Sequence, residues 1–284
     1  MYAATGLGWD DPEEGWHHCP PGAGIYNKVF LEERSPMFIK DMFVRPNIDE
    51  NSAEVWVDVY NTSDDLVENF EIEVEILTKN FKGQGTPAVK FPVEYAGPGM
   101  NYYRYRIELP EVRLWEPESP WLYIARATVH GPKGKDSRDS QFGMRKFHMD
   151  EEQELKGTLY FNNRPIKLRG TNEMGHLPQC VMRGDFDQLI DDILIAKLAN
   201  LNFYRITQRP VHDEVYEYMD MLGMMNQTDL PTFGYFRRSQ FSEGVRQAAE
   251  MERLIRSHPS AVMVSLINEP SRTEKRNKGH RYLY

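Results

Sequence analysis

Hydrophobic and polar positions alternate through much of residues 36–148, with the two-residue period of a half-buried β-strand. The stretch SAEVWVDVYNTSDD places three valines on one face, Val55, Val57 and Val59. The stretch ENFEIEVEILTKN repeats the pattern with four apolar positions, Phe70, Ile72, Val74 and Ile76. Further strands are expected in YYRYRIELP and WLYIARATVHG. Strands at this spacing, without helical periods between them, indicate an antiparallel β-sandwich.

Glutamates occupy the opposite face of the second of these strands, at Glu71, Glu73 and Glu75. An acidic face is most simply a solvated one. It would also protect an exposed sheet edge from pairing with another strand. We therefore expect this strand to lie with its acidic face in solvent.

From residue 149 onward, strand and helix signals alternate. The stretch GTLYFNNRPIKLRGTN predicts a hairpin-like pair that leads into an apolar strand. Helices are predicted in DFDQLIDDILIAKLAN with Asp185 as its cap, in DEVYEYMDML before Gly223, and in SEGVRQAAEMERLIRS. Strands are predicted between and after them, in NFYRIT, MMNQTDLP and AVMVSLIN. This order specifies parallel pairing with right-handed crossovers. No glycine-rich phosphate turn of a doubly wound nucleotide-binding fold follows the first strand.

The first 34 residues are rich in glycine, proline and aromatic side chains. Only IYNKVFLEER among them predicts a strand, and a segment this short cannot bury a core alone. We expect it to be the last piece of a domain that begins earlier. The side chains of Trp9, Trp16, His17 and His18 are expected to pack a loop rather than to form a sugar platform or a metal site.

Composition narrows the classes of function. The chain has 43 acidic and 34 basic residues, a formal charge of −9, which disfavours nucleic-acid binding. No apolar run has the length of a membrane-spanning helix, and the amino terminus lacks the pattern of a signal peptide, so localisation stays open. The two cysteines, Cys19 and Cys180, form no CxxC pair. They predict neither a zinc site nor a disulfide framework, and no cofactor is expected.

The stretch HPSAVMVSLINEP ends an apolar strand in Asn268, Glu269 and Pro270. A buried strand that delivers a carboxylate at its carboxyl end is the usual way in which a barrel enzyme presents an acid or a base. Glu269 is therefore the leading candidate for a catalytic residue.

Several strings, taken together and in order, resemble glycoside hydrolase family 2, which includes β-galactosidases, β-glucuronidases and β-mannosidases. They are GWHHCPPGAGI, LWEPESPWLY, FGMRKF, NNRPIKLRGTN, NFYRITQRP, YMDMLGMM and HPSAVMVSLINEP. The resemblance implies that residues 1–34 end a jelly-roll sugar-binding domain. Residues 35–148 would then be an immunoglobulin-like β-sandwich, and residues 149–284 the first half, four βα units, of a (β/α)8 catalytic barrel.

The resemblance also implies roles for single residues. Glu269 would be the general acid/base of a retaining, exo-acting β-glycosidase, and Asn268 would contact the sugar 2-hydroxyl. Arg205 would steady the nucleophile. Asn172 and His176 would lie on the rim of the active site, while Asp229 could bind substrate or serve the structure. The expected partner is a carbohydrate substrate, and neither a nucleic acid nor a membrane is expected as a partner. Whether the longer protein from which this chain would come forms homo-oligomers is left open.

Some positions depart from the family pattern. Related sequences often have tryptophan where Val264 stands, a His-Glu pair at Met174 and Gly175, and histidine at Gln208. The sugar recognised by the active site therefore stays open. No residue here matches the family's nucleophile, a glutamate on the seventh barrel strand, so we expect an internal fragment that is inactive alone. The alternative is a non-catalytic carbohydrate-binding or scaffold protein with a degenerate barrel.

Overall fold

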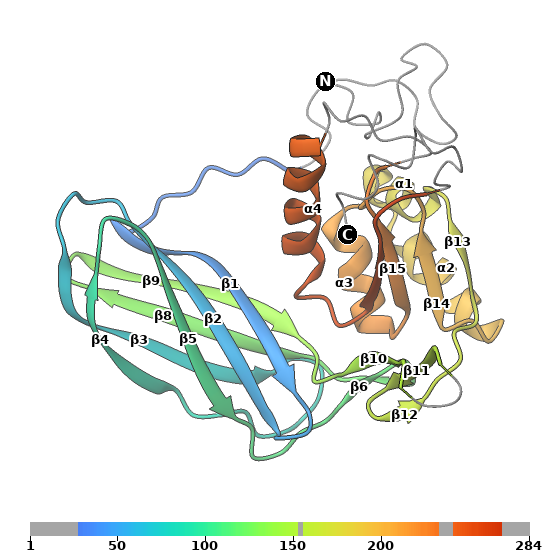
Figure 1. Ribbon diagram of the computed structural model, residues 1–284, viewed down its shortest axis with the longest axis horizontal. Helices are drawn as coiled ribbons and strands as arrows, with labels where there is room; N and C mark the ends of the chain where they lie inside the picture. The colour runs from blue at the N-terminus through green and yellow to red at the C-terminus, as the bar shows by residue number, and fades with distance from the viewer. Residues whose placement is uncertain (1–27, 153–155, 233–240, 269–284) are drawn as a thin grey trace, which may run out of the picture. The chain divides into compact units, whose positions relative to one another are not determined.

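The computed structural model describes residues 28–152, 156–232 and 241–268 (Figure 1). The chain divides into two compact units. The sandwich unit is Phe30–Lys167. The barrel unit is Leu168–Tyr284 together with Met1–Val29.

The sandwich unit contains two antiparallel sheets, as the alternating pattern predicts (Figure 1). One sheet has the order β1-β2-β5, formed by β1 (Met37–Asn47), β2 (Ser52–Asn61) and β5 (Gly99–Glu108). The other has the order β4-β3-β8-β9, formed by β4 (Val89–Ala96), β3 (Val67–Thr78), β8 (Tyr123–Gly131) and β9 (Gly134–Phe142). Two small sheets accompany them, formed by β6 (Trp115–Glu116), β7 (Ser119–Pro120), β10 (Phe147–Asp150), β11 (Thr158–Phe161) and β12 (Arg164–Pro165).

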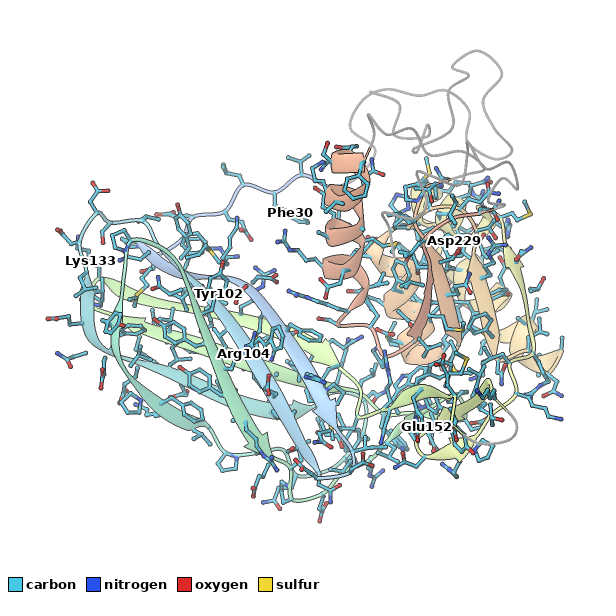
Figure 2. The ribbon with its side chains drawn as sticks, viewed as in Figure 1. Phe30, Tyr102, Arg104, Lys133, Glu152 and Asp229 are labelled. Atoms are coloured by element: carbon cyan, nitrogen blue, oxygen red, sulfur yellow. The ribbon has the colours of Figure 1, made fainter. Side chains whose placement is uncertain are left out.

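The core of the sandwich consists of the inward residues expected from the sequence. The valines of β2 are fully buried, as are Ile72, Val74 and Ile76 of β3, and Phe70 is 5% exposed. Each such side chain contributes about 1.5–3 kcal/mol by leaving water. Polar and aromatic side chains lie on the outer face of the sheets. Tyr102 and Arg104 of β5 are two of them (Figure 2). The predicted β-sandwich is therefore confirmed.

The acidic face of β3 differs from the expectation of a protected edge. That strand lies between β4 and β8, so it has no free edge to protect, and the prediction is wrong in this respect. The three glutamates of this face are half-buried, and each has a basic group nearby on a neighbouring strand. The pairs are Glu71 with Lys90 at 3.1 Å, Glu73 with His130 at 3.8 Å, and Glu75 with Arg126 at 3.4 Å.

Strand β9, which the sequence did not predict, is polar along most of its length, and only Phe142 of its nine residues is buried. It is held to β8 by side chains on the outer face. Arg126 of β8 donates from Nε and Nη2 to the two carboxylate oxygens of Asp139, at 2.8 and 2.9 Å. The hydroxyls of Thr128 and Ser137 lie 2.8 Å apart. Polar cross-strand pairs thus replace the apolar alternation seen in β2 and β3.

The described part of the barrel unit contains four parallel strands in sequential order. They are β13 (Gly170–Glu173), β14 (Phe203–Ile206), β15 (Met225–Asp229) and β16 (Ala261–Ser265). The helices are α1 (His176–Arg183), α2 (Phe186–Leu198), α3 (Asp213–Leu222) and α4 (Phe241–Ile255) (Figure 1). Buried side chains of the helices, such as Leu189, Ile193 and Met219, pack with Tyr204 and Ile206 of β14. The alternating order predicted for a half-barrel is confirmed.

The ends of two helices follow the predicted signals. The carboxylate of Asp185 accepts the Gln188 N–H at 3.2 Å and caps α2. Gly223 ends α3 with φ 72°, the left-handed conformation that glycine adopts without steric cost. None of the helices in the described residues is long and apolar enough to cross a membrane.

Two strand predictions need correction. The first barrel strand is not apolar, because three of its four residues are exposed and only Glu173 is buried. Gly170 is needed there, since a Cβ would lie 2.5 Å from the Phe203 carbonyl oxygen of β14. In IYNKVFLEER, the described residues 28–34 form no strand. Its β-forming residues have no strand partner among the described residues, and Val29 and Phe30 are each 75% exposed.

Candidate active site

The carboxyl ends of the four parallel strands bring together polar residues that are far apart in sequence. Asn172 of β13 lies beside Arg205 of β14 in the strand register. Asp229 ends β15 and is paired in register with Ser265, the last residue of β16. Asn268 follows three residues later. In an α/β barrel this end of the strands carries the active site.

The carboxylate of Asp229, the residue labelled in Figure 2, is fully buried and connects the members of this group through its hydrogen bonds. Its Oδ2 accepts hydrogen bonds from Arg205 Nε at 3.0 Å, Arg205 Nη2 at 2.6 Å and the Gln208 backbone N–H at 3.1 Å. Its Oδ1 accepts from Gln227 Nε2 at 2.9 Å. A buried carboxylate with one guanidinium and two further donors is well satisfied. These contacts hold the Arg205 guanidinium in place.

Arg205 extends the network from Asp229 to the segment after β16. Its Nη2 also donates to Asn268 Oδ1 at 2.6 Å. The Asn268 backbone N–H donates to the Thr232 carbonyl at 2.9 Å, so both main chain and side chain of this residue are fixed. Asn268 is 6% exposed, and its Nδ2 has no hydrogen-bond partner among the described residues. A buried amide N–H group without a partner costs about 1–3 kcal/mol, which a ligand acceptor could recover.

Gln208 has an unusual backbone. Its φ is 68°, in the left-handed region of the backbone that residues other than glycine and asparagine rarely adopt. The N–H of this residue donates to Asp229, as described above, and its side chain is only 8% exposed. Such a conformation costs about 1–3 kcal/mol and persists where the surroundings fix it, often at a functional site.

Glu173 and His176 lie at the start of α1. The Glu173 carboxylate is buried and accepts the backbone N–H groups of Gly175 and Leu177, each at 2.9 Å. It therefore takes the place of a side-chain cap, which the sequence did not suggest. His176 is the first residue of α1 instead of a loop residue, and its Nε2 lies 2.7 Å from Asp192 Oδ2 of α2. The hydrogen bond of His176 is thus to α2 and not to the Arg205, Asp229 and Asn268 group.

Glu269, the predicted acid/base, lies outside the described residues, as do Cys19, His17 and His18. Asn172 is exposed at the carboxyl end of its strand.

A second polar cluster lies before β16, at the opposite end of that strand. The ring of His258, 9% exposed, lies between two carboxylates, with Nδ1 2.6 Å from Asp220 Oδ2 and Nε2 3.1 Å from Asp213 Oδ1. Burial lowers the pKa of His258, but Asp220 and Asp213 outweigh it and raise the pKa to about 10. Asp220 is fully buried and also accepts the Ser260 N–H at 3.0 Å. The cluster therefore holds an imidazolium in the folded protein at neutral pH.

Four parallel strands with polar residues at their carboxyl ends, in a chain that also contains a β-sandwich, indicate an enzyme of the α/β-barrel class. Two family models match the chain: Glycosyl hydrolases family 2 over residues 37–145, and Glycosyl hydrolases family 2, TIM barrel domain, over residues 154–283. The chain belongs to glycosyl hydrolase family 2.

The curated relatives of the chain include β-galactosidases. One from Psychromonas ingrahamii is 26% identical over 265 residues, which cover 87% of this chain and 25% of the relative. Another from Vibrio vulnificus is 25% identical over 275 residues, which cover 90% of this chain and 26% of the relative. The chain thus spans about a quarter of the length of the relatives that it matches.

Solved structures share the fold. A β-glucuronidase of Bacteroides uniformis superposes with a TM-score of 0.70 at 22% identity, over 87% of this chain and 32% of that chain. A family 2 β-galacturonidase of Eisenbergiella tayi, bound to galacturonate, superposes with a TM-score of 0.71 at 19% identity, over 88% of this chain and 44% of that chain. At these identities the likeness concerns the fold.

Proposed function

We propose that this chain is part of a retaining, exo-acting β-glycosidase that removes terminal β-linked sugars. The proposal is supported by the family membership and by the polar residues Arg205, Asp229 and Asn268, which lie near the carboxyl ends of the parallel strands. We further propose the domain assignment that the resemblance implies: 1–34 as the end of a jelly-roll domain, 35–148 as the sandwich, and 149–284 as the opening half of the barrel.

The observation that carries the proposal is the state of Asn268. Arg205 holds its Oδ1, and its Nδ2 has no partner among the described residues. A fixed amide with a free N–H group suits a sugar hydroxyl as acceptor. We assign that hydroxyl to C2, where a hydrogen bond strengthens as the transition state develops positive charge on the sugar. Asp229 then acts as a positioning residue, since it fixes the guanidinium that fixes Asn268.

Glu269 is assigned as the general acid/base. In the first step its carboxylic acid gives a proton to the leaving glycosidic oxygen while a second carboxylate bonds to the anomeric carbon. In the second step the Glu269 carboxylate takes a proton from water, whose oxygen displaces the nucleophile and frees the sugar. The nucleophile would be a glutamate on the seventh barrel strand, and no residue of these 284 matches it.

The test begins with the reading frame downstream of Tyr284. We expect it to continue into further barrel strands with a strand-borne glutamate, and the encoded longer protein is the one to assay. Its Glu269→Ala variant should lose activity most on substrates with poor leaving groups, which need protonation. Activated aryl glycosides should still form the glycosyl-enzyme, and azide should restore turnover by attacking it without base assistance. If activated substrates no longer glycosylate the variant and azide rescues nothing, the assignment is wrong.

The contribution of Asn268 can be separated from that of Glu269. Asn268→Ala should reduce kcat/KM for good and poor leaving groups alike, because the 2-hydroxyl bond serves both steps. Gln84→Ala, which removes an exposed amide of the sandwich unit, is the matched control and should leave kcat/KM unchanged. A leaving-group dependence in Asn268→Ala like that of Glu269→Ala would contradict the separate roles.

The sugar recognised is open to a direct comparison. The relatives named above are β-galactosidases, a β-glucuronidase and a β-galacturonidase. A panel of aryl β-galactoside, β-glucuronide, β-galacturonide, β-glucoside and β-mannoside would rank them by kcat/KM. Hydrolysis of none of the panel by the longer protein would refute the proposed function.

A further inference from the structure

A group of three potential metal ligands joins the first two helices of the barrel unit. His176 and Cys180 are four residues apart on α1, so they lie on the same face of the helix. Asp192 faces them from α2. The His176 ring nitrogen, the Cys180 sulfur and an Asp192 carboxylate oxygen all lie within 4.8 Å of one another.

The distances are close to those of a tetrahedral metal site. His176 Nε2 lies 2.7 Å from Asp192 Oδ2, and Cys180 Sγ lies 4.0 Å from the same oxygen. Zinc holds nitrogen and oxygen at about 2.0–2.1 Å and sulfur at about 2.3 Å, so its ligand atoms are about 3.3–3.6 Å apart. Small side-chain rotations would reach that geometry. His176 is free to make them, because its side chain is 59% exposed.

Two neighbouring side chains support the group as outer-shell partners would. Gln188 Nε2 donates to Asp192 Oδ1 at 2.7 Å, which orients the carboxylate and leaves Oδ2 toward His176. Burial raises the pKa of the Cys180 thiol, and the charge of Arg183, whose Nη2 lies 3.7 Å from Cys180 Sγ, acts in the opposite direction. Outer-shell hydrogen bonds of this kind fix ligand orientation and typically account for about 10–100-fold in metal affinity.

We propose that His176, Cys180 and Asp192 bind a zinc-class divalent ion. On binding, the thiol gives its proton to solvent, so that one thiolate, one carboxylate and one neutral imidazole balance the two positive charges of the metal. A sulfur and an imidazole nitrogen favour zinc or cobalt over magnesium or calcium, which prefer oxygen ligands. The exposed side of His176 leaves a fourth position for water. This site does not depend on the proposed glycosidase activity.

The chain itself, all 284 residues, is the protein to test, with Co²⁺ as a spectroscopic substitute for Zn²⁺. A cobalt–thiolate bond gives a charge-transfer band in the near ultraviolet, and displacement of the band by Zn²⁺ reports the zinc affinity. We expect the band in the parent chain, with no displacement by Mg²⁺ at the same concentration. No band at saturating Co²⁺ would overturn the proposal.

Variants identify which thiol binds the metal. Cys180→Ser should abolish the band, and Cys19→Ser is the matched control that should retain it. His176→Gln, at an exposed position that the fold tolerates, should weaken Co²⁺ binding at least about 100-fold, since a ligand contributes more than an outer-shell partner. The helical circular dichroism of each variant checks that the barrel unit is folded. A band that disappears in Cys19→Ser and persists in Cys180→Ser would show that the metal binds elsewhere.

Discussion

Replacement of His258 by glutamine should remove a large part of the stability of the barrel unit. Glutamine retains some hydrogen-bonding capacity but lacks the positive charge that lies 2.6 Å from the fully buried Asp220 carboxylate. Removing one partner of a buried ion pair typically costs about 3–5 kcal/mol, because the remaining charge is left in a poorly solvated place.

The pKa gives a second measure of the same interaction. The ordinary pKa of histidine is 6.5, and that of His258 in the folded protein is about 10. Each pKa unit corresponds to 1.36 kcal/mol, so this difference is worth about 5 kcal/mol. The contribution of Asp213 to that value is discounted, because its side chain is 60% exposed and solvent screens it. We therefore expect His258→Gln to lose about 3–5 kcal/mol at pH 6.5.

The sign of the pH dependence follows from the raised pKa. The folded state keeps a proton on His258 that the unfolded state releases above pH 6.5, so the stabilisation is complete below pH 6.5 and is lost as the pH rises to about 10. Asp213 affects stability at acid pH, because its hydrogen bond to His258 lowers its pKa from the ordinary value of 3.8. The stability that it contributes is present above pH 3.8 and is lost as the pH falls through the lowered pKa. The free-energy difference between the parent chain and His258→Gln should accordingly narrow toward pH 10.

The assay is urea unfolding followed by helical circular dichroism, because the described helices all belong to the barrel unit. The free energy of unfolding would be measured for both chains at several values from pH 6.5 to pH 10. Glu217→Gln removes an exposed charge of α3, in the same unit as His258, and should change the free energy of unfolding by less than about 0.5 kcal/mol. A loss below 1 kcal/mol for His258→Gln, or a difference that does not vary with pH, would refute the reasoning.

Three other changes test other parts of the fold. Asp229→Asn should cost about 3 kcal/mol in the same assay, since it removes the buried charge beside a guanidinium; a loss below 1 kcal/mol would contradict the network. Asp185→Ala should cost about 1 kcal/mol through loss of the α2 cap, whereas Asp187→Ala, which removes no cap, should cost less. Ile72→Ala should cost the sandwich unit about 3 kcal/mol by tryptophan fluorescence, and Val89→Ala, at a position 38% exposed, should cost less than half as much.

The sequence predicts those elements in which a periodic apolar pattern meets a burial requirement. The valines of β2 and the apolar residues of β3 face the core, and α2 begins at its predicted cap. Strand β9 was missed because its sequence GKDSRDSQF carries no apolar alternation, so its place depends on side chains of β8. Helix α1 was missed because it has eight residues, includes Pro178 and has no side-chain cap from its own N-cap residue. Its start depends on the carboxylate of Glu173.

The candidate active site also has features that the sequence predicts and features that it does not. The position of a polar residue near the end of a predicted strand can be read from sequence, and this holds for Arg205 and Asp229, whereas Asn268 lies three residues beyond the observed end of β16. The sequence does not show which of these residues form hydrogen bonds with one another, because this depends on the register of three strands and on the rotamer of Arg205. The Gln227 donor lies two residues before Asp229 on β15, so it shares a face of that strand, whereas the donor from the Gln208 backbone follows β14 and has no sequence signal.

The polar contacts of β9 have a consequence for the accuracy of strand pairing. In β3, a slip of one residue would place glutamates in the core, so the apolar pattern rejects it. β9 has almost no apolar pattern to reject such an error. In the observed register Arg126 faces Asp139, and a slip of two residues would put Ser137 or Gln141 opposite it. The ion pair between Arg126 and Asp139 therefore favours one register of β9 on β8 among several that would bury the same apolar surface.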